Sequence, residues 1–320
     1  MSAGWPSVLC TTNGPSLPIR TRPASQLPPI PDRPDFWQAR GVLTLPARLL
    51  GDSDRSAVQR LLDRDPYAAA QVAEQIDTYG LAWWRTEARV FGYGPPQALE
   101  SVCWLGNNLI PVHATPAAVA AFAELAGLNG RSCSSLVGTA DAVLDLWTRL
   151  APAWGRARDV RPCQPLLATG AAPAVPPDPQ VRLVRDRELT ALYPAAVAMY
   201  TEEVGISPTL DGGDFAYRER VADLIRGRRM YARFADGKVV FKAELAAVTR
   251  HTAQIQGVWV APEWRGRGVG TRAMAAVLRD ALTRVAPTVS LYVNDYNHAA
   301  RAVYARCGFR RVGTFATVLF

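Results

Sequence analysis

The spacing of apolar residues in the C-terminal part of the chain predicts alternating strands and helices. Short alternating runs indicate strands, and apolar residues recurring every three or four positions indicate amphipathic helices. The predicted elements are a strand at 181–184, helices at 188–203 and 215–225, strands at 230–234, 239–248 and 253–260, a helix at 271–285, a strand at 289–293, a helix after residue 297, and one or more strands at 309–320. The order is therefore β-α-α-β-β-β-α-β-α-β.

Local signals support these boundaries. Asp236-Gly237 lies between two strand-like runs and predicts a tight hairpin. Asn297 is a good N-cap for the last helix, and Gly308 is the residue expected just after its end.

Residues 35–168 predict a separate α/β domain. We expect a strand at 42–45, one or two helices in 54–76, strands within 79–93 and 99–112, helices at 117–125 and 140–150, and a strand at 160–167 that contains two prolines. This order resembles that of residues 181–320. A diverged second copy of the C-terminal fold and an unrelated α/β domain both fit the pattern.

Two segments lack any periodic apolar pattern. Residues 1–34 contain eight prolines and four charged residues, which predicts a disordered leader. Residues 169–180 are rich in proline and alanine, which predicts a linker between the two domains.

The main candidate for a binding site is the loop Arg265-Gly266-Arg267-Gly268-Val269-Gly270-Thr271, between the strand at 253–260 and the helix that follows. Glycine permits positive φ and allows successive N–H groups to point at one anion. The helix N-terminus adds unpaired donors and a partial positive charge. Such a loop suits a pyrophosphate, and the two arginines can add charge-assisted hydrogen bonds.

Other interpretations of the loop are weaker. Gly268-x-Gly270-x-x-Ala273 formally matches a dinucleotide-binding fingerprint, with Asp295 loosely placed as the ribose acid. That fingerprint directly follows its strand, whereas the segment Pro-Glu-Trp-Arg-Gly-Arg (262–267) intervenes here, and no Lys-Ser/Thr pair follows as a P-loop requires. A simple surface turn rarely combines this glycine spacing with flanking arginines.

Charge and composition narrow the classes of partner. Residues 1–180 contain 15 basic and 15 acidic side chains, so the net charge of +8 belongs to residues 181–320. A cationic half suits an anionic ligand, while no nucleic-acid motif accompanies it. No apolar run approaches the roughly 18 residues of a membrane span. The five cysteines and three histidines show no metal-ligand spacing, so we expect no metal and a cytoplasmic protein.

Two motifs together resemble the GCN5-related N-acetyltransferases (GNAT superfamily) across residues 181–320. Arg265, Gly268 and Gly270 match the family's Gln/Arg-x-x-Gly-x-Gly/Ala signature. Asn297, Ala300, Tyr304, Gly308 and Phe309 match its later segment. The whole chain also resembles bacterial two-domain proteins in which an uncharacterised domain precedes a GNAT domain. The resemblance implies an α/β fold with a mixed, mostly antiparallel sheet flanked by helices.

The resemblance also implies an activity and roles for residues. Acetyl-CoA would be the co-substrate, and an acceptor amine would attack its thioester directly. Val258 and Val260 would offer backbone groups to the pantetheine arm, and the amides of 265–271, including Gly266, Arg267, Val269 and Thr271, would hold the pyrophosphate. Asn297 would bond the cofactor arm, and Tyr304 would protonate the departing thiolate as general acid.

The sequence offers more than one candidate for the general base. The family's usual glutamate position corresponds to Gln254, which cannot accept a proton. Glu244 on the neighbouring strand is the best replacement, although an ion-paired strand residue, a water relay or an already neutral amine fit as well. Cys307 has no partner that would make it a nucleophile, so we interpret it as a packing residue.

The resemblance implies that the loop between the first two helices of 181–320 lines the acceptor pocket. Acidic residues crowd that region, which predicts a cationic acceptor, either a small amine or a lysine or N-terminal amine of a protein. They are Glu202, Glu203, Asp211 and Asp214. Helix ends also attract acids, so a purely structural role is the alternative. A non-catalytic acyl-CoA sensor is the alternative function, and the sequence leaves open whether two subunits pair and what the N-terminal domain does.

Overall fold

The computed structural model describes residues 47–86, 88–95, 97–128 and 130–320. The leader expected at 1–34 and the strand expected at 42–45 lie outside these residues. Within the described residues, no helix combines the length and the apolar character needed to cross a bilayer.

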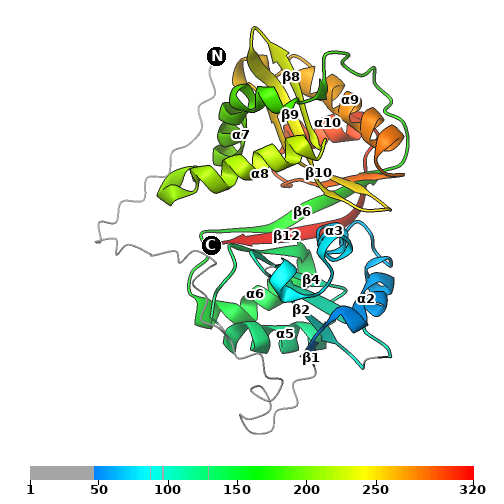
Figure 1. Cartoon of the computed structure of the whole chain (residues 1–320), viewed down its shortest axis with the longest axis vertical. Helices are drawn as coiled ribbons and strands as arrows, with labels where there is room; N and C mark the ends of the chain where they lie inside the picture. Colours follow the sequence, from blue (N-terminus) through cyan, green and yellow to red (C-terminus); the bar gives the residue numbers. More distant parts are fainter. Residues whose placement is uncertain (1–46, 87, 96, 129) are drawn as a thin grey trace. The chain divides into compact units, whose positions relative to one another are not determined.

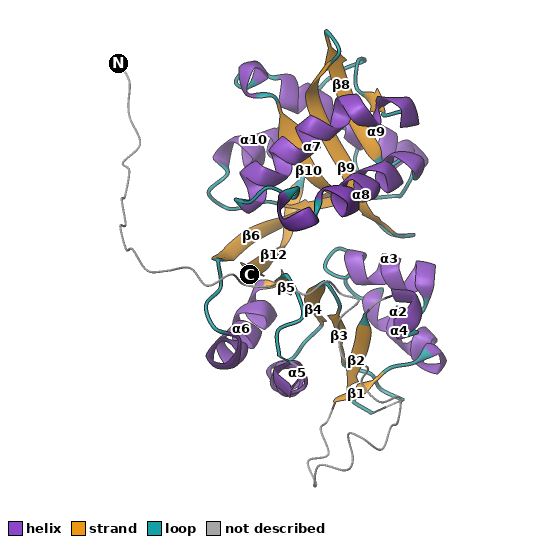
Figure 2. Ribbon diagram, turned by 60° about the vertical axis from the view of Figure 1, so that its left-hand side comes forward, coloured by secondary structure: helices purple, strands orange, loops and turns teal. Residues whose placement is uncertain are grey.

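The described residues form a single twelve-stranded sheet with helices on both faces (Figures 1 and 2). The strands are β1 (Ala47–Leu49), β2 (Arg89–Tyr93), β3 (Ser101–Leu105), β4 (Asn108–Val112), β5 (Ser135–Thr139), β6 (Asp159–Thr169), β7 (Arg182–Leu183), β8 (Met230–Ala235), β9 (Lys238–Val248), β10 (Ala253–Val260), β11 (Val289–Tyr292) and β12 (Arg310–Leu319). The main helices are α2 (Arg55–Leu62), α3 (Ala70–Tyr79), α4 (Trp83–Thr86), α5 (Pro116–Leu128), α6 (Ala140–Trp154), α7 (Leu189–Val204), α8 (Asp214–Arg226), α9 (Val269–Arg284) and α10 (His298–Arg306).

The same order of elements occurs twice along the chain. Setting aside the one-turn helix α4 and short 3₁₀ turns, β1 to β6 and β7 to β12 each follow β-α-α-β-β-β-α-β-α-β. Helices α2 and α3 pack on one face of the N-terminal half and α5 and α6 on the other. In the C-terminal half, α7 and α8 pack on one face and α9 and α10 on the other. We refer to these as the N-terminal and C-terminal halves.

The two halves exchange their last strands. The order across the sheet is β1-β2-β3-β4-β5-β12-β6-β11-β10-β9-β8-β7. The last strand of the chain, β12, thus pairs with β5 of the N-terminal half, and β6 pairs with β11 of the C-terminal half. The two exchanged strands also pair with each other, antiparallel, from Arg310 with Ala168 to Leu319 with Asp159 (Figure 1).

A buried polar group stabilises the crossing. Gln164 on β6 is 3% exposed, donates to Asn294 Oδ1 at 2.8 Å and accepts from the Thr317 hydroxyl at 2.6 Å. Its amide is therefore satisfied by residues distant in sequence on both sides, which favours one register of the exchanged strands over others.

Most predicted elements are present, and the clearest error lies in 79–93. Tyr79 ends α3, Gly80 follows with φ of 78°, and α4 occupies Trp83–Thr86 before β2 begins at Arg89. The aromatic residues there suggested a strand because aromatic side chains favour sheets. Trp84 is instead 67% exposed on a short helix.

The turn and cap predictions in the C-terminal half are confirmed. Asp236 and Gly237 both have positive φ, as a two-residue hairpin turn of type I′ requires. The side chain of Asn297 accepts from the N–H of Ala300 and caps α10, and Gly308 follows the helix with φ of 95°.

The segment predicted as a linker makes specific contacts. Thr169 still belongs to β6, and the side chain of Asp178 is buried. Asp178 accepts from Arg233 at 3.0 Å, and its N–H donates to the Arg272 carbonyl at 2.9 Å. The domain boundary at 169–180 stays a prediction, since the sheet itself runs without a break through both halves.

The strand exchange predicts that the C-terminal half needs the N-terminal half in order to fold. A fragment of residues 177–320 lacks β6, which leaves the facing edges of β11 and β12 without a pairing strand. We expect this fragment alone to aggregate or to unfold without cooperativity in urea, and co-expression with residues 1–176 to restore a soluble complex. A monomeric 177–320 fragment with a cooperative unfolding transition would contradict this.

Candidate active site

The C-terminal half has an opening between β10 and β11. These parallel strands pair only through Ala253 with Val289 and Gln254 with Ser290. Beyond these pairs, β10 continues to Val260 without β11 as a partner. Gly257, with φ of 57°, lies at an irregularity in the pairing of β10 with β9. The end of β10 therefore has backbone groups without a partner strand on its β11 side, and the roles of Val258 and Val260 stay predictions.

The glycine-rich loop follows this opening. Gly266 and Gly268 have φ of 73° and 75°, and Gly268 is the N-cap of α9. A Cβ on either glycine would contact nothing within 4 Å, so the space beside the loop is open. In the described part of the chain, the N–H groups of Gly266, Arg267 and Gly268 donate no hydrogen bond. The loop thus has the free donors and the helix N-terminus that an anion requires.

Arg265 is held in place by two groups. Its Nε donates to the Val260 carbonyl at 2.9 Å, and its guanidinium pairs with Glu202 at 2.8 Å. Glu202 also accepts from the indole N–H of Trp259 at 3.0 Å. The Val260 carbonyl predicted to contact the pantetheine arm is therefore occupied by Arg265. The Arg267 guanidinium lies 5.9 Å from the ring centre of Trp264, a weak cation–π contact.

Tyr304 lies on α10 with a buried ring and a free hydroxyl. The residue is 6% exposed, and its ring packs edge-on against Phe309 with centroids 5.9 Å apart. Within the described residues the hydroxyl has no hydrogen-bond partner. Desolvation and the nearby charge of Glu203 raise the pKa of Tyr304. Asn297 stands two turns earlier, at the exposed start of the same helix.

Glu244 lies between two cations. It is 6% exposed and accepts from Lys242 Nζ at 3.0 Å and from the Arg220 guanidinium at 3.3 Å. Burial favours its neutral form, but the two cations prevail and lower its pKa. A carboxylate stabilised in this way is a weak base, so the geometry favours the ion-paired alternative. The assignment of Glu244 as general base stays a prediction.

The structure gives a physical reason for a glutamine at position 254. Gln254 is 1% exposed, and residues of the N-terminal half cover it. Its amide oxygen accepts from Gln71 at 3.3 Å, and its amide nitrogen donates to the Tyr67 carbonyl at 3.3 Å. An ionised glutamate there would lose the bond to the Tyr67 carbonyl and bury a charge.

A different carboxylate, Glu203 at the end of α7, is available near Tyr304. Glu203 is exposed on the surface, and desolvation by the surrounding protein raises the pKa of its carboxyl. Arg161 and Lys242 act on it as positive charges and Glu244 as a negative one. In the described residues its carboxylate has no hydrogen bond or ion pair.

Arg161 connects this carboxylate to the N-terminal half. It lies on the exchanged strand β6, is 9% exposed, and pairs with Asp159 at 2.9 Å. Its guanidinium also donates to the backbone carbonyl of Glu203. Sequence reasoning grouped Glu203 with three other acids and had no signal for Arg161, because their contact depends on the strand exchange.

The other predicted acceptor residues are already paired or lie outside the description. Glu202 binds Arg265 and Trp259, and Asp214 accepts from the Tyr193 hydroxyl at 2.8 Å. The side chain of Asp211 is outside the described part of the chain. Of the described members of this acidic group, Glu203 alone keeps an unpaired carboxylate.

Cys307 is a packing residue, as predicted. It is fully buried beside α9, and its thiol lies 3.5 Å from the Thr271 carbonyl. Burial raises its pKa to about 11, so it is protonated at neutral pH and a poor nucleophile.

The N-terminal half lacks the corresponding groups. Its strands β4 and β5 also pair over only two residues, but the turn after β4 has no glycine. A Cβ at Gly138 of β5 would lie 3.2 Å from the Pro111 carbonyl on β4, so the two strands stay close there. Tyr304 is seven residues after the N-cap of α10, and the same position of α6 is the buried Leu146. The described half has neither the loop nor the tyrosine.

The C-terminal half combines a strand opening, a glycine-rich loop at a helix N-terminus and a tyrosine on the next helix. Among the described residues this combination occurs once, in a fold whose order of elements occurs twice. Residues 190–309 match the model of the acetyltransferase (GNAT) family. This match supports an acetyltransferase that uses an acyl-CoA. Residues 88–192 match a domain of unknown function (DUF4081).

Solved structures share the fold over most of the chain at low sequence identity. A Drosophila protein is 12% identical, covers 86% of this chain and 98% of its own, and has a TM-score of 0.60. A GCN5-related N-acetyltransferase from Sphaerobacter thermophilus is 16% identical over 85% of this chain and 94% of its own, with a TM-score of 0.51. A GNAT-family acetyltransferase from Colwellia psychrerythraea is 15% identical over 86% and 99%, with a TM-score of 0.50. No curated protein matches the sequence.

The loop geometry predicts that Gly268→Ala destabilises the protein. Its φ of 75° is a left-handed conformation that costs an alanine about 1–2 kcal/mol, although the added methyl group meets open space. The measurement is the free energy of unfolding in urea. Gly127→Ala is the matched control, because its Cβ also meets open space within helix α5 and alanine there should be neutral or stabilising. Equal effects of the two substitutions would refute the strain argument.

Proposed function

We propose that the protein is an N-acetyltransferase that transfers the acetyl group of acetyl-CoA directly to an acceptor primary amine. The observation that carries the proposal is that the β10/β11 opening, the free N–H groups of Gly266, Arg267 and Gly268 and the unpartnered hydroxyl of Tyr304 all occur in one half. These features belong to the C-terminal half, which also carries the excess positive charge.

The loop and the strand end fit acetyl-CoA. Free amides of Gly266, Arg267 and Gly268 at the start of α9 suit a pyrophosphate, and Arg265 and Arg267 flank it. The backbone of Val258 and the side chain of Asn297 are proposed to bind the pantetheine arm. When bound, acetyl-CoA supplies an acetyl thioester, whose carbonyl a β10 amide would polarise.

Tyr304 is proposed as the general acid. Burial and the negative charge of Glu203 raise its pKa, so the hydroxyl keeps its proton across the physiological range. A protonated phenol without another partner can give that proton to the departing thiolate.

Glu203 is proposed to bind the acceptor amine and to take its proton. Its raised pKa makes it a better base than an ordinary glutamate, and its unpaired carboxylate can accept from an ammonium group. Glu244, which forms ion pairs with Lys242 and Arg220, would act as a fixed negative charge. The acceptor is then a cationic amine, small or part of a protein.

The N-terminal half is proposed to shape access for the acceptor. It covers Gln254 through Gln71 and Tyr67, and it supplies Arg161 behind Glu203. This role needs no catalytic group in the N-terminal half.

Tyr304→Phe tests the enzyme against an acyl-CoA sensor. We expect turnover, measured as free thiol release with a panel of amines, amino acids and lysine peptides, to fall about 100-fold or more, as for a lost general acid. Acetyl-CoA binding, followed by thermal shift, should remain. Turnover by neither the native protein nor the variant, with binding intact in both, would favour the sensor.

Glu203→Gln tests the proposed base. We expect kcat/KM to fall in the Glu203→Gln variant. We also expect the acidic limb of the plot of kcat/KM against pH to disappear. In the native enzyme this limb should lie at a higher pH than an ordinary glutamate gives, because only the deprotonated carboxylate accepts the proton and its pKa is raised. Glu219→Gln on the exposed surface of α8 is the charge-matched control.

Glu244→Gln separates the two candidate bases in the same pH series. A change in KM with the acidic limb retained fits a fixed charge. Loss of the limb in Glu244→Gln but not in Glu203→Gln would return the role of base to Glu244.

A further inference from the structure

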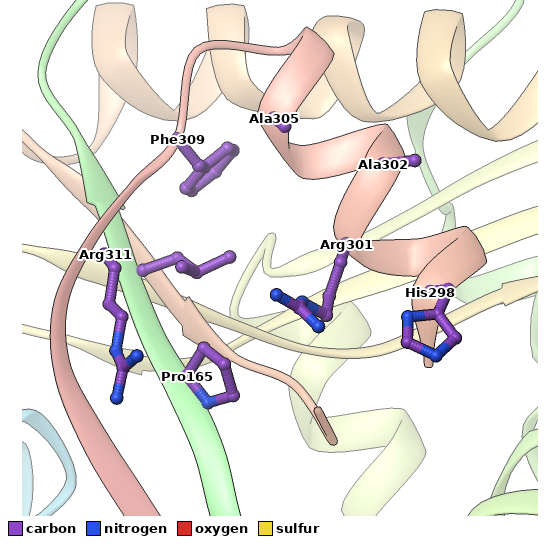
Figure 3. A pocket seen from close by; sticks show the side chains of 8 residues that line it. Pro165, His298, Arg301, Ala302, Ala305, Phe309 and Arg311 are labelled. Carbon is purple, nitrogen blue, oxygen red and sulfur yellow. The ribbon is translucent and has the colours of Figure 1, made fainter. Parts of the chain in front are cut away.

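A cavity lies on the face of α10 that is turned away from α9. It has a volume of 410 Å³ between the helix and the exchanged strands β6 and β12 (Figure 3). Figure 3 shows Arg301 extending from α10 toward Pro165 and Arg311 standing beside Pro165 on the strands. The opposite face of α10 packs on α9, where Val303 comes close to Gly270 of the loop. The cavity is therefore separate from the proposed acyl-CoA site.

The two arginines of the cavity have no acidic residue beside them in its lining. Arg301, Arg311 and His298 line it, and among its described lining residues there is no aspartate or glutamate. Arg301 donates to the backbone carbonyl of Asp295 at 2.9 Å. Arg311 donates to the Gly313 carbonyl at 3.2 Å and to the Thr314 hydroxyl. These neutral acceptors fix both guanidinium groups and leave donors free, since each carries five N–H groups.

The remaining lining is apolar. Pro165 and Leu167 form its floor on β6, and Phe309 lies at the end of α10. Ala302 and Ala305 face the cavity from the helix, and their short side chains leave the space that larger residues would fill. Phe309 also contacts the ring of Tyr304, so the cavity shares a wall with the proposed general acid.

We propose that this cavity binds a small organic anion with a flat apolar body and one or two negative charges. A carboxylate, sulfonate or phosphate would accept from Arg301 and Arg311, because charge-assisted bonds to arginine are the strong ones. The body would lie against Phe309 and Leu167. An inorganic anion would leave the apolar floor uncovered and bind more weakly.

The test uses anilinonaphthalene sulfonate as a fluorescent probe on the full chain, with excess coenzyme A present to occupy the proposed acyl-CoA site. We expect saturable binding of one probe per chain. Arg301→Gln and Arg311→Gln should each weaken it about 10-fold, the effect of one lost charge-assisted hydrogen bond. Arg306→Gln on the same helix removes the same charge but does not line the cavity, so it should have little effect. Ala302→Trp, at an exposed helix position, should block binding by filling the space.

Several outcomes overturn the proposal. They are an absence of saturable binding, equal weakening by Arg306→Gln, or undiminished binding in Ala302→Trp. Competition by inorganic phosphate as strong as that by an aryl carboxylate would also overturn it, because the apolar floor would then contribute nothing. Thermal melts of each variant show whether it is folded. None of these measurements depends on turnover, so failure here is distinguishable from failure of the proposed acetyltransferase activity.

Discussion

The pairing of β6 with β12 is the interaction on which the rest of the structure depends. Each half ends in a strand that completes the sheet of the other, and the two strands pair along almost their whole length. Without this exchange, β11 and β5 would each lack one of their two neighbouring strands. The buried amide of Gln164 forms hydrogen bonds with one residue on β12 and one beside β11. Specific hydrogen bonds as well as apolar packing therefore hold the exchanged strands in register.

The exchange places residues of one half within the site of the other. Arg161 on β6 supports the backbone of Glu203, and Gln71 and Tyr67 cover Gln254. The order of elements occurs twice, but among the described residues only the C-terminal half has the glycine-rich loop and the tyrosine. The half without the glycine loop and the tyrosine is free to pack tightly, as Pro111 and Gly138 do, and to support the half whose strands must stay apart.

The charges of the site follow from the same arrangement. Lys242 and Arg220 hold Glu244 as a fixed carboxylate, while Glu203 is accessible, partly desolvated and unpaired. Two acids close together thus have pKa values shifted in opposite directions by their neighbours. Environments that separate pKa values in this way are typical of sites that need one group as a fixed charge and another as a proton carrier.

The sequence by itself determined what depends on neighbouring residues. The loop conformation at Gly266 and Gly268, the Asp236-Gly237 hairpin, the cap at Asn297 and the order of elements follow from local backbone preferences and apolar periodicity, and the family's two motifs lie on these elements. Only the tertiary structure decided which strands pair at the centre of the sheet, why position 254 is a glutamine, and which acid stays unpaired beside Tyr304. Those outcomes depend on contacts between residues more than a hundred positions apart in several cases, such as Gln71 with Gln254 and Gln164 with Asn294. Burial and charge at such contacts come from the assembled fold, and no local pattern encodes them.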